Sequence, residues 1–170
     1  SFTTKGPQLD LSIGYLGIGC TNVKTPDIRK MHEHAREILG DLCDEELVID
    51  PLGRLTFYLR DFDNNLFQIL ESDKWFTNHG HPSGGIMGCT IGVSNIEESF
   101  KLYCNILGYD KVLLDESGSF EDWAHLPGGV ENYRRVILEQ TNPGTGGFAA
   151  VMGETTIELV QALDRKGRFI

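Results

Sequence analysis

The sequence predicts an α+β protein made of two similar units, and three observations lead to this class. Residues 87–93 alternate between apolar and small or polar side chains, which is the period-2 pattern of a half-buried strand. Residues 96–107 carry an apolar stripe at helical spacing, which must pack on a sheet. Residues 13–23 and 25–40 repeat this order, with a strand pattern followed by a helix pattern. We therefore expect two strand-helix units that continue into further strands.

The helix of the second unit has sequence signals at both ends. Ser94 and Glu97 have the spacing of a capping box, in which each side chain satisfies a free backbone N–H at the start of a helix. Gly108 suits the left-handed conformation that ends many helices. Residues 109–114 are expected to form the next strand. The apolar stripe consists of Ile96, Phe100, Tyr103 and Leu107.

The helix of the first unit is expected to begin at Thr25, the predicted N-cap. Pro26 then occupies the first helical position and Asp27 the first turn, which both favour a helix start. Gly40 ends the helix, and residues 45–50 are expected to form a strand. The buried stripe consists of Ile28, Met31, Ala35, Ile38 and Leu39.

The remaining strands follow from alternation and turn chemistry. Residues 54–60 and 65–71 both alternate, and the Asp and Asn residues between them tolerate tight turns, so we predict a hairpin. The closing strands of the second unit are predicted at 135–140, 149–152 and 155–162. The other segments are a leading arm (1–12), a linker (72–84), a long loop (116–134) and a tail (164–170). Loops as long as 116–134 are usually functional or disordered.

Composition limits the possible partners and compartments. The chain has 170 residues, 25 acidic and 15 basic side chains and a net charge of −10, which repels nucleic acid and anionic membrane surfaces. It has no apolar run of membrane-spanning length. Its four cysteines lack C-x-x-C spacing, so reduced core thiols and a cytoplasmic location are expected. The chain begins without Met, which fits a piece of a longer protein.

Three stretches resemble a known superfamily. Residues 85–114, the hairpin RDFDNNLFQILES and the strand TTIELVQA are similar to modules of the vicinal oxygen chelate superfamily. That superfamily includes glyoxalase I, methylmalonyl-CoA epimerase, extradiol dioxygenases and bleomycin-resistance proteins. The resemblance covers about residues 13–71 and 85–163. It implies two βαβββ modules whose mixed sheets form a cup, with the helices packed outside.

The resemblance also implies where a divalent metal would bind. The four matching positions are Gly17, Gln68, Gly88 and Glu158, and a shift of one residue would replace Gly17 by Ile18. Glycine has no side chain to donate, so two of the usual four ligands are missing. We therefore expect no complete metal site and no cofactor. A divalent cation held by Gln68, Glu158, water and substrate stays open as the alternative.

Gln68 and Glu158 have two possible roles. A carboxylate that points into an apolar cup has a raised pKa, so Glu158 is the best candidate for a catalytic base. The alternative is structural: both side chains form hydrogen bonds across the cup with Thr56, Thr90 or Thr156. Gln68 and Thr90 could equally contact a ligand.

Other candidate ligand contacts lie on the hairpin and the long loop. Tyr58 and Arg60 share a strand face, and Arg60 could meet an anionic substrate or pair with an acid of the turn. The 116–134 loop could fold over the mouth of the cup and bring Trp123 and His125 onto a ligand, or form a surface flap.

Three functional hypotheses follow. The first is a protein of the bleomycin-resistance type that binds a small molecule in the cup without a complete metal site. The second is a lyase or isomerase of the glyoxalase I or methylmalonyl-CoA epimerase type, with Glu158 as base or metal ligand. The third is the non-catalytic half of a longer four-module enzyme. The expected partners are a small-molecule ligand and either a second copy of the chain or further modules.

Overall fold

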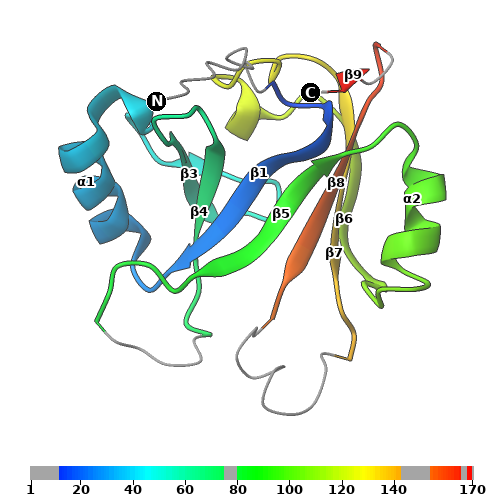
Figure 1. Ribbon diagram of the computed structural model, residues 1–170, viewed down its shortest axis with the longest axis horizontal. Helices are drawn as coiled ribbons and strands as arrows, with labels where there is room; N and C mark the ends of the chain where they lie inside the picture. The colour runs from blue at the N-terminus through cyan, green and yellow to red at the C-terminus, as the bar shows by residue number, and fades with distance from the viewer. Residues whose placement is uncertain (1–11, 75–79, 143–153, 166–167, 170) are drawn as a thin grey trace, which may run out of the picture.

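The computed structural model describes residues 12–74, 80–142, 154–165 and 168–169. They form one curled, mixed sheet of nine strands with helices α1 (Ile28–Leu39) and α2 (Ile96–Tyr103) on its outer face (Figure 1). The strand order is β2-β3-β4-β1-β5-β8-β7-β6, and β9 pairs with the start of β1. The strands are β1 (Tyr15–Thr25), β2 (Val48–Ile49), β3 (Leu55–Arg60), β4 (Leu66–Glu71), β5 (Ile86–Gly92), β6 (Lys111–Gly118), β7 (Tyr133–Glu139), β8 (Thr156–Ala162) and β9 (Arg168–Phe169).

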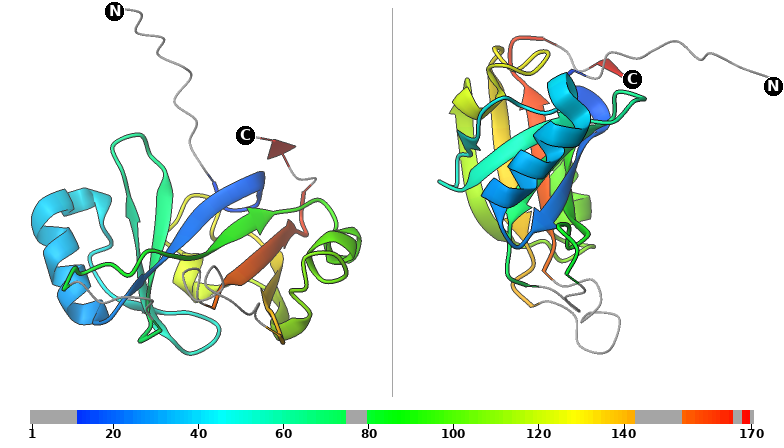
Figure 2. Two further views of the ribbon diagram at one scale, coloured as in Figure 1. Left: turned by 60° about the horizontal axis from the view of Figure 1, so that its bottom comes forward. Right: turned by 90° about the vertical axis from the view of Figure 1, so that its left-hand side faces the viewer.

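The two halves of the sheet meet at β1 and β5. These strands are antiparallel, with Cys20 opposite Thr90. On the outer sides of this pair, β1 runs parallel to β4 and β5 runs parallel to β8. Each half therefore has the order of a βαβββ module, and the views in Figure 2 show that the sheet curls around one concave face. The α+β class with two βαβββ modules is confirmed.

Helix α1 starts later than its sequence signals suggested. Its N-cap is Asp27, which accepts a hydrogen bond from the backbone N–H of Lys30 at 3.1 Å. Thr25 was the expected cap, but its hydroxyl instead donates to the carbonyl of Pro82 at 2.7 Å. Gly40 ends the helix with a φ of 56°, as expected. Ile38 was assigned to the buried stripe and is 64% exposed, which is a correction.

Helix α2 is shorter than predicted. Asn95, rather than Ser94, is the N-cap and accepts from the backbone N–H of Glu98 at 3.2 Å. The helix ends at Tyr103, and Leu107 lies beyond it, 45% exposed. The predicted stripe therefore loses its last member. The apolar face of α2 still packs on the sheet, where Ile96 is fully buried.

Alternation divides the sheet into an outer and an inner face. Outward-facing residues pack beneath the helices, in one cluster under α1 that includes Phe57 and Ile69 and one under α2 that includes Val136 and Leu159. A third cluster lies on the inner face. It contains Ile13, Cys20, Tyr58, Leu66, Phe120, Trp123, Leu126, Tyr133 and Val160.

Several predicted boundaries differ from the structure. Strand β2 is only two residues long, whereas residues 45–50 were predicted. Strand β6 extends to Gly118, so the long loop begins at 119 instead of 116. Part of the predicted tail forms β9. The predicted strand at 149–152 and almost all of the leading arm lie outside the described residues.

Candidate functional site

The inner face of the sheet carries a buried network of charges centred on Arg135. This β7 side chain is 1% exposed. Its Nε donates to Oε1 of Glu158, and its Nη1 donates to both carboxylate oxygens of Asp122 at 2.9 and 2.8 Å. The other oxygen of Glu158 accepts from the hydroxyl of Thr90 at 2.6 Å. One guanidinium therefore lies between two buried carboxylates.

Aromatic side chains complete this network. The guanidinium carbon of Arg135 lies 3.7 Å from the centroid of the Trp123 ring, which is cation–π geometry. Trp123 Nε1 donates to the hydroxyl of Tyr58 at 2.9 Å, and that hydroxyl donates to Asp122 at 3.2 Å. The polar tips of both aromatic residues thus have hydrogen-bond partners, which permits their burial.

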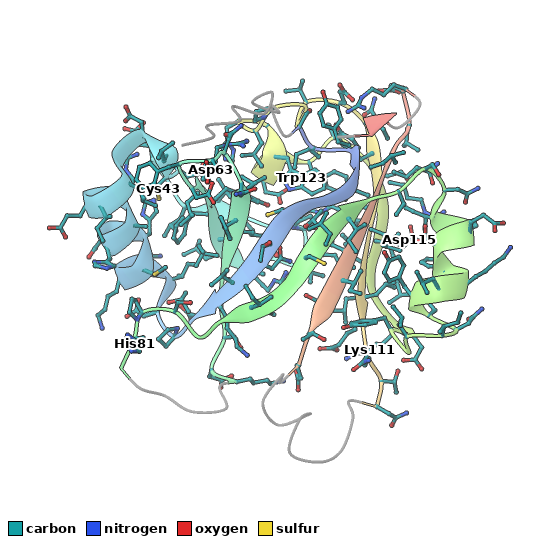
Figure 3. All side chains as sticks on the ribbon, in the orientation of Figure 1. Cys43, Asp63, His81, Lys111, Asp115 and Trp123 are labelled. Atoms are coloured by element: carbon teal, nitrogen blue, oxygen red, sulfur yellow. The ribbon has the colours of Figure 1, made fainter. Side chains whose placement is uncertain are left out.

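The 119–132 loop folds into the cup. Its short 3-10 helix η2 (Glu121–Trp123) lies beside the upper end of β1 in the view of Figure 1, and Figure 3 labels Trp123 close to it. Trp123 is 1% exposed and packs against Phe120 and Tyr133. It therefore fills the cup and does not face a ligand at the mouth. The covering-loop hypothesis is therefore wrong for Trp123.

Burial changes the protonation behaviour of this network. Burial, reinforced by the charge of Asp122, holds the pKa of Tyr58 well above its usual value. Burial, together with Glu158, also raises the pKa of the Cys20 thiol. Burial alone would lower the pKa of Arg135, but the charge of Glu158 raises it above its ordinary value. Tyr58 and Cys20 are therefore neutral and Arg135 is charged at neutral pH.

The contacts of Glu158 are those of the structural alternative that its sequence allowed. It is 3% exposed, and its carboxylate is held by Thr90 and Arg135. The predicted hydrogen bond between Thr90 and Glu158 is confirmed. The cup around Glu158 is charged rather than apolar, so the argument for a catalytic base does not hold for this residue.

The four implied metal positions do not converge on one point. Gln68 and Gly88 lie on opposite sides of Asn22 in the sheet register. Gly17 lies opposite Gly92, near the start of β1. The β1 residue beside Gln68 is thus Asn22, which the resemblance did not identify. Both amides are buried, and Asn22 Oδ1 and Gln68 Nε2 have no hydrogen-bond partner among the described residues.

The side chains at these positions do not fit a metal of the kind that the resemblance implies. A Cβ atom at Gly88 would lie 2.0 Å from the carbonyl oxygen of Thr156, so no ligand side chain fits there without movement of the backbone. The carboxylate of Glu158 is already paired with Arg135. Within the described parts of the chain, no group of three or more His, Cys, Asp or Glu side chains is arranged to hold a metal ion.

Three of the predicted ligand contacts line one pocket. It has a volume of about 450 Å³ and lies at the mouth of the cup, where the 119–132 loop meets the first half of the sheet. In the view of Figure 3, Asp63 of the hairpin turn lies between Cys43 and Trp123. The pocket brings together Tyr58, Arg60 and His125, whereas Gln68, Thr90 and Trp123 are buried away from it. We call it the mouth pocket; further lining residues are Arg36, Asp41, Leu42, Cys43, Asp44, Glu45, Leu59, Leu66, Leu126 and Pro127.

His125 is held in the mouth pocket by Asp44. Its Nε2 lies 3.0 Å from Oδ1 of Asp44, and its ring centroid lies 5.8 Å from that of Tyr58. The other oxygen of Asp44 accepts from the backbone N–H of Tyr58 at 2.7 Å. Asp44 therefore fixes the orientation of the imidazole, which is 38% exposed. His125 faces accessible space, unlike its neighbour Trp123.

The sequence-based analysis missed several residues that organise the site. Arg135 has the same period-2 phase as Tyr133 and Ile137, so its inward direction could have been read from the strand pattern. Asp44 and Asp122 belong to no sequence motif that would have identified them. Their contacts depend on segments far apart in the chain, which spacing alone does not reveal.

Comparison with known proteins supports the fold. The sequence matches no model of a protein family and no curated protein. Among solved structures, it is similar to a proposed dioxygenase from Bacillus subtilis subsp. subtilis str. 168, with 16% identity, a TM-score of 0.55 and coverage of 87% of this chain and 41% of that chain. It is also similar to glyoxalase I from Zea mays, with 16% identity, a TM-score of 0.52 and coverage of 88% and 44%. The chain has the vicinal oxygen chelate fold.

This chain and the two proteins named above differ in length. The chain spans less than half of the length of both the Bacillus protein and the maize glyoxalase I. Methylmalonyl-CoA epimerase from Mycobacterium tuberculosis, at 14% identity and a TM-score of 0.46, matches over 93% of this chain and 96% of its own. Among the described residues, no helix has the length and apolar character needed to cross a membrane.

Proposed function

We propose that this chain is a glyoxalase- and bleomycin-resistance-like protein that binds a small molecule without a complete metal site. The observation that supports this proposal is the mouth pocket, which gathers Tyr58, Arg60 and His125 in one accessible space. Its volume of about 450 Å³ is within the range of small-molecule sites. The ligand lies between the 119–132 loop and the first half of the sheet. We also propose a cytoplasmic location, because all four cysteines are free thiols.

The polar groups of the mouth pocket suit binding and orientation. Asp44 and Tyr58 position the imidazole of His125, while apolar side chains such as Leu66 and Leu126 line the same space. The lining is more polar than that of most small-molecule sites, which favours a ligand held by oriented polar groups beside a smaller apolar contact. The buried network around Arg135 lies behind the pocket and fixes the loop that forms one of its walls.

A ligand screen with a blocking variant tests the proposal. We would screen a fragment library by ligand-observed NMR against the wild type, Glu45→Trp and Glu46→Trp. Both positions are exposed, but only Glu45 lines the mouth pocket. We expect hits that bind the wild type and Glu46→Trp and are lost in Glu45→Trp. Hits that bind all three proteins equally, or no hits at all, would contradict the proposal.

A second candidate function is the non-catalytic half of a longer four-module enzyme. The observation that favours it is the coverage of only 41% and 44% of the proposed dioxygenase and of maize glyoxalase I. The intact mass of the native protein, measured by mass spectrometry after its isolation from extracts of its source, tests this candidate. A native mass about twice 19.0 kDa would support it, and a mass close to 19.0 kDa would exclude it.

A further inference from the structure

We propose that the mouth pocket binds a small organic oxyanion, a carboxylate or phosphate group on an apolar body, and that Arg36 and Arg60 are its anchors. This inference rests on the proposed function and names its ligand class. Three observations support it. Arg36 and Arg60 lack acidic partners among the described residues, hydrogen bonds hold both guanidinium groups in place, and apolar side chains line part of the pocket.

The arginines of the mouth pocket differ from most others in the described parts of the chain. Ion pairs with Asp or Glu are formed by four other arginines, namely Arg54, Arg134, Arg135 and Arg165. Arg36 and Arg60 form none with described residues, and both line the same pocket. The chain has 25 acidic side chains and a net charge of −10, so unpaired guanidinium groups are not explained by a shortage of carboxylates. An anionic ligand would supply the missing partner.

Each of these guanidinium groups is already held in place. Nη1 of Arg36 donates to the carbonyls of Gly40 and Cys43, at 2.8 and 2.7 Å. Nη1 of Arg60 donates to the side chain of Asn64 at 3.0 Å. These contacts reduce the entropy that a ligand would have to remove from two long side chains. Planar guanidinium groups held in this way match carboxylate or phosphate oxygens.

Arg60 also has an unsatisfied donor. Its Nη2 is buried and has no hydrogen-bond partner among the described residues. Buried donors in folded proteins normally have a protein, water or ligand partner. The sequence left open whether Arg60 pairs with an acid of the turn. The structure shows Asn64 as its partner instead, so its charge is not neutralised by Asp61 or Asp63.

Asp41, Asp44 and Glu45 also line the mouth pocket, so an anion would be attracted at Arg36 and Arg60 and not by the pocket as a whole. Asp44 is engaged by the backbone of Tyr58 and by His125. Asp41 and Glu45 are exposed at the rim, where water and salt screen their charges. The arginines are both half-buried, so their interactions with a bound anion are screened less. The apolar part of the ligand would contact Leu59, Leu66, Leu126 and Pro127.

Matched probe pairs test the ligand class. We would measure affinities of phenylacetate, phenylacetamide and phenyl phosphate by NMR titration at constant ionic strength. Phenylacetate and its amide have nearly the same shape, so their difference reports the charge of the ligand. We expect the amide to bind about tenfold more weakly, the effect of one charge-assisted hydrogen bond. Tighter binding of phenylacetate or of phenyl phosphate would show which of the two oxyanions the mouth pocket prefers.

Three variants locate the anion. Arg60→Gln should weaken phenylacetate binding about tenfold. Arg60→Lys should weaken it less, because lysine keeps the positive charge but lacks the paired N–H donors of the guanidinium group. Arg29→Gln makes the same change in net charge at a helix position outside the mouth pocket, and should change affinity less than about twofold. Melting temperatures would verify that all variants fold.

The outcomes separate this inference from the proposed function. Equal binding of phenylacetate and phenylacetamide, lost in Glu45→Trp, would overturn the oxyanion class and leave small-molecule binding intact. Equal weakening by Arg60→Gln and Arg29→Gln would also overturn it. Absence of binding by all three probes and by the fragment library would overturn both proposals.

Discussion

Arg135 of β7 donates a hydrogen bond from Nε to Oε1 of Glu158 of β8, and both side chains are at most 4% exposed. In the metal-site hypothesis, Glu158 would face a divalent cation. In this chain, an internal guanidinium supplies the positive charge next to that carboxylate. The same guanidinium holds Asp122 and so fastens the 119–132 loop inside the cup. Glu158 is therefore part of the framework behind the mouth pocket.

Removal of the negative charge of Glu158 should destabilise the protein. We expect Glu158→Gln to lower the free energy of unfolding by about 2 kcal/mol, because two charge-assisted hydrogen bonds, from Arg135 and Thr90, are weakened while Asp122 still pairs with the guanidinium. Urea denaturation followed by tryptophan fluorescence measures this change. The control is Glu37→Gln at an exposed position of α1, with an expected change below about 0.5 kcal/mol. Equal effects of the two variants would contradict the structural role of Glu158.

Metal content tests the cofactor prediction. We expect the purified chain to retain far less than one equivalent of metal after chelator dialysis and reloading with Zn²⁺, Ni²⁺, Mn²⁺ or Fe²⁺. Two of the implied ligand positions are Gly17 and Gly88, and Glu158 is paired with Arg135. Elemental analysis of the wild type and Glu158→Ala measures this. Near-stoichiometric metal in the wild type that is lost in Glu158→Ala would contradict the prediction. It would support the lyase or isomerase hypothesis instead.

Much of the fold could be predicted from local patterns. Alternation identified the hairpin of β3 and β4, and helical periodicity placed α1 and α2, because both patterns reflect one-sided burial. The errors concern the ends of helices and strands. Both predicted caps precede the actual ones, because Asp27 and Asn95 compete with Thr25 and Ser94 for the cap position. Such choices depend on tertiary contacts, such as that of Thr25 with Pro82.

The site could be predicted only in part. Tyr58, Arg60 and His125 were identified by their residue types and positions, and they share a pocket. The inward fold of Trp123 was not predicted, because it depends on contacts with Arg135 and with Tyr58, which lies 65 residues away in the chain. Sequence patterns place charged residues at the surface by default. A buried ion network breaks that default and becomes visible only once the strands are in register.

Gly88 of β5 should not tolerate a side chain. We expect Gly88→Ala to destabilise the protein by about 2–3 kcal/mol or to prevent folding, since its Cβ would lie 2.0 Å from the Thr156 carbonyl oxygen. The control is Gly19→Ala on the neighbouring strand β1, where a Cβ has no atom within 4 Å. That variant should change stability by less than about 1 kcal/mol. Thermal unfolding by circular dichroism measures both, and similar melting temperatures for the two variants would contradict the close contact at Gly88.

The cysteines should react with iodoacetamide in an order set by burial. Burial, reinforced by the charge of Asp44, raises the pKa of Cys43 to about 11, and burial also raises the pKa of Cys20. Only the thiolate is alkylated, so labelling of Cys43 at pH 8 should be slow and should accelerate as the pH rises toward 11. Cys89 and Cys104 are half-buried and should react first. Mass spectrometry of native and urea-unfolded protein measures the order, with equal labelling expected when unfolded. Labelling of native Cys43 at pH 8 as fast as that of Cys104 would show that residues 41–45 open readily, and would thus contradict a preformed mouth pocket.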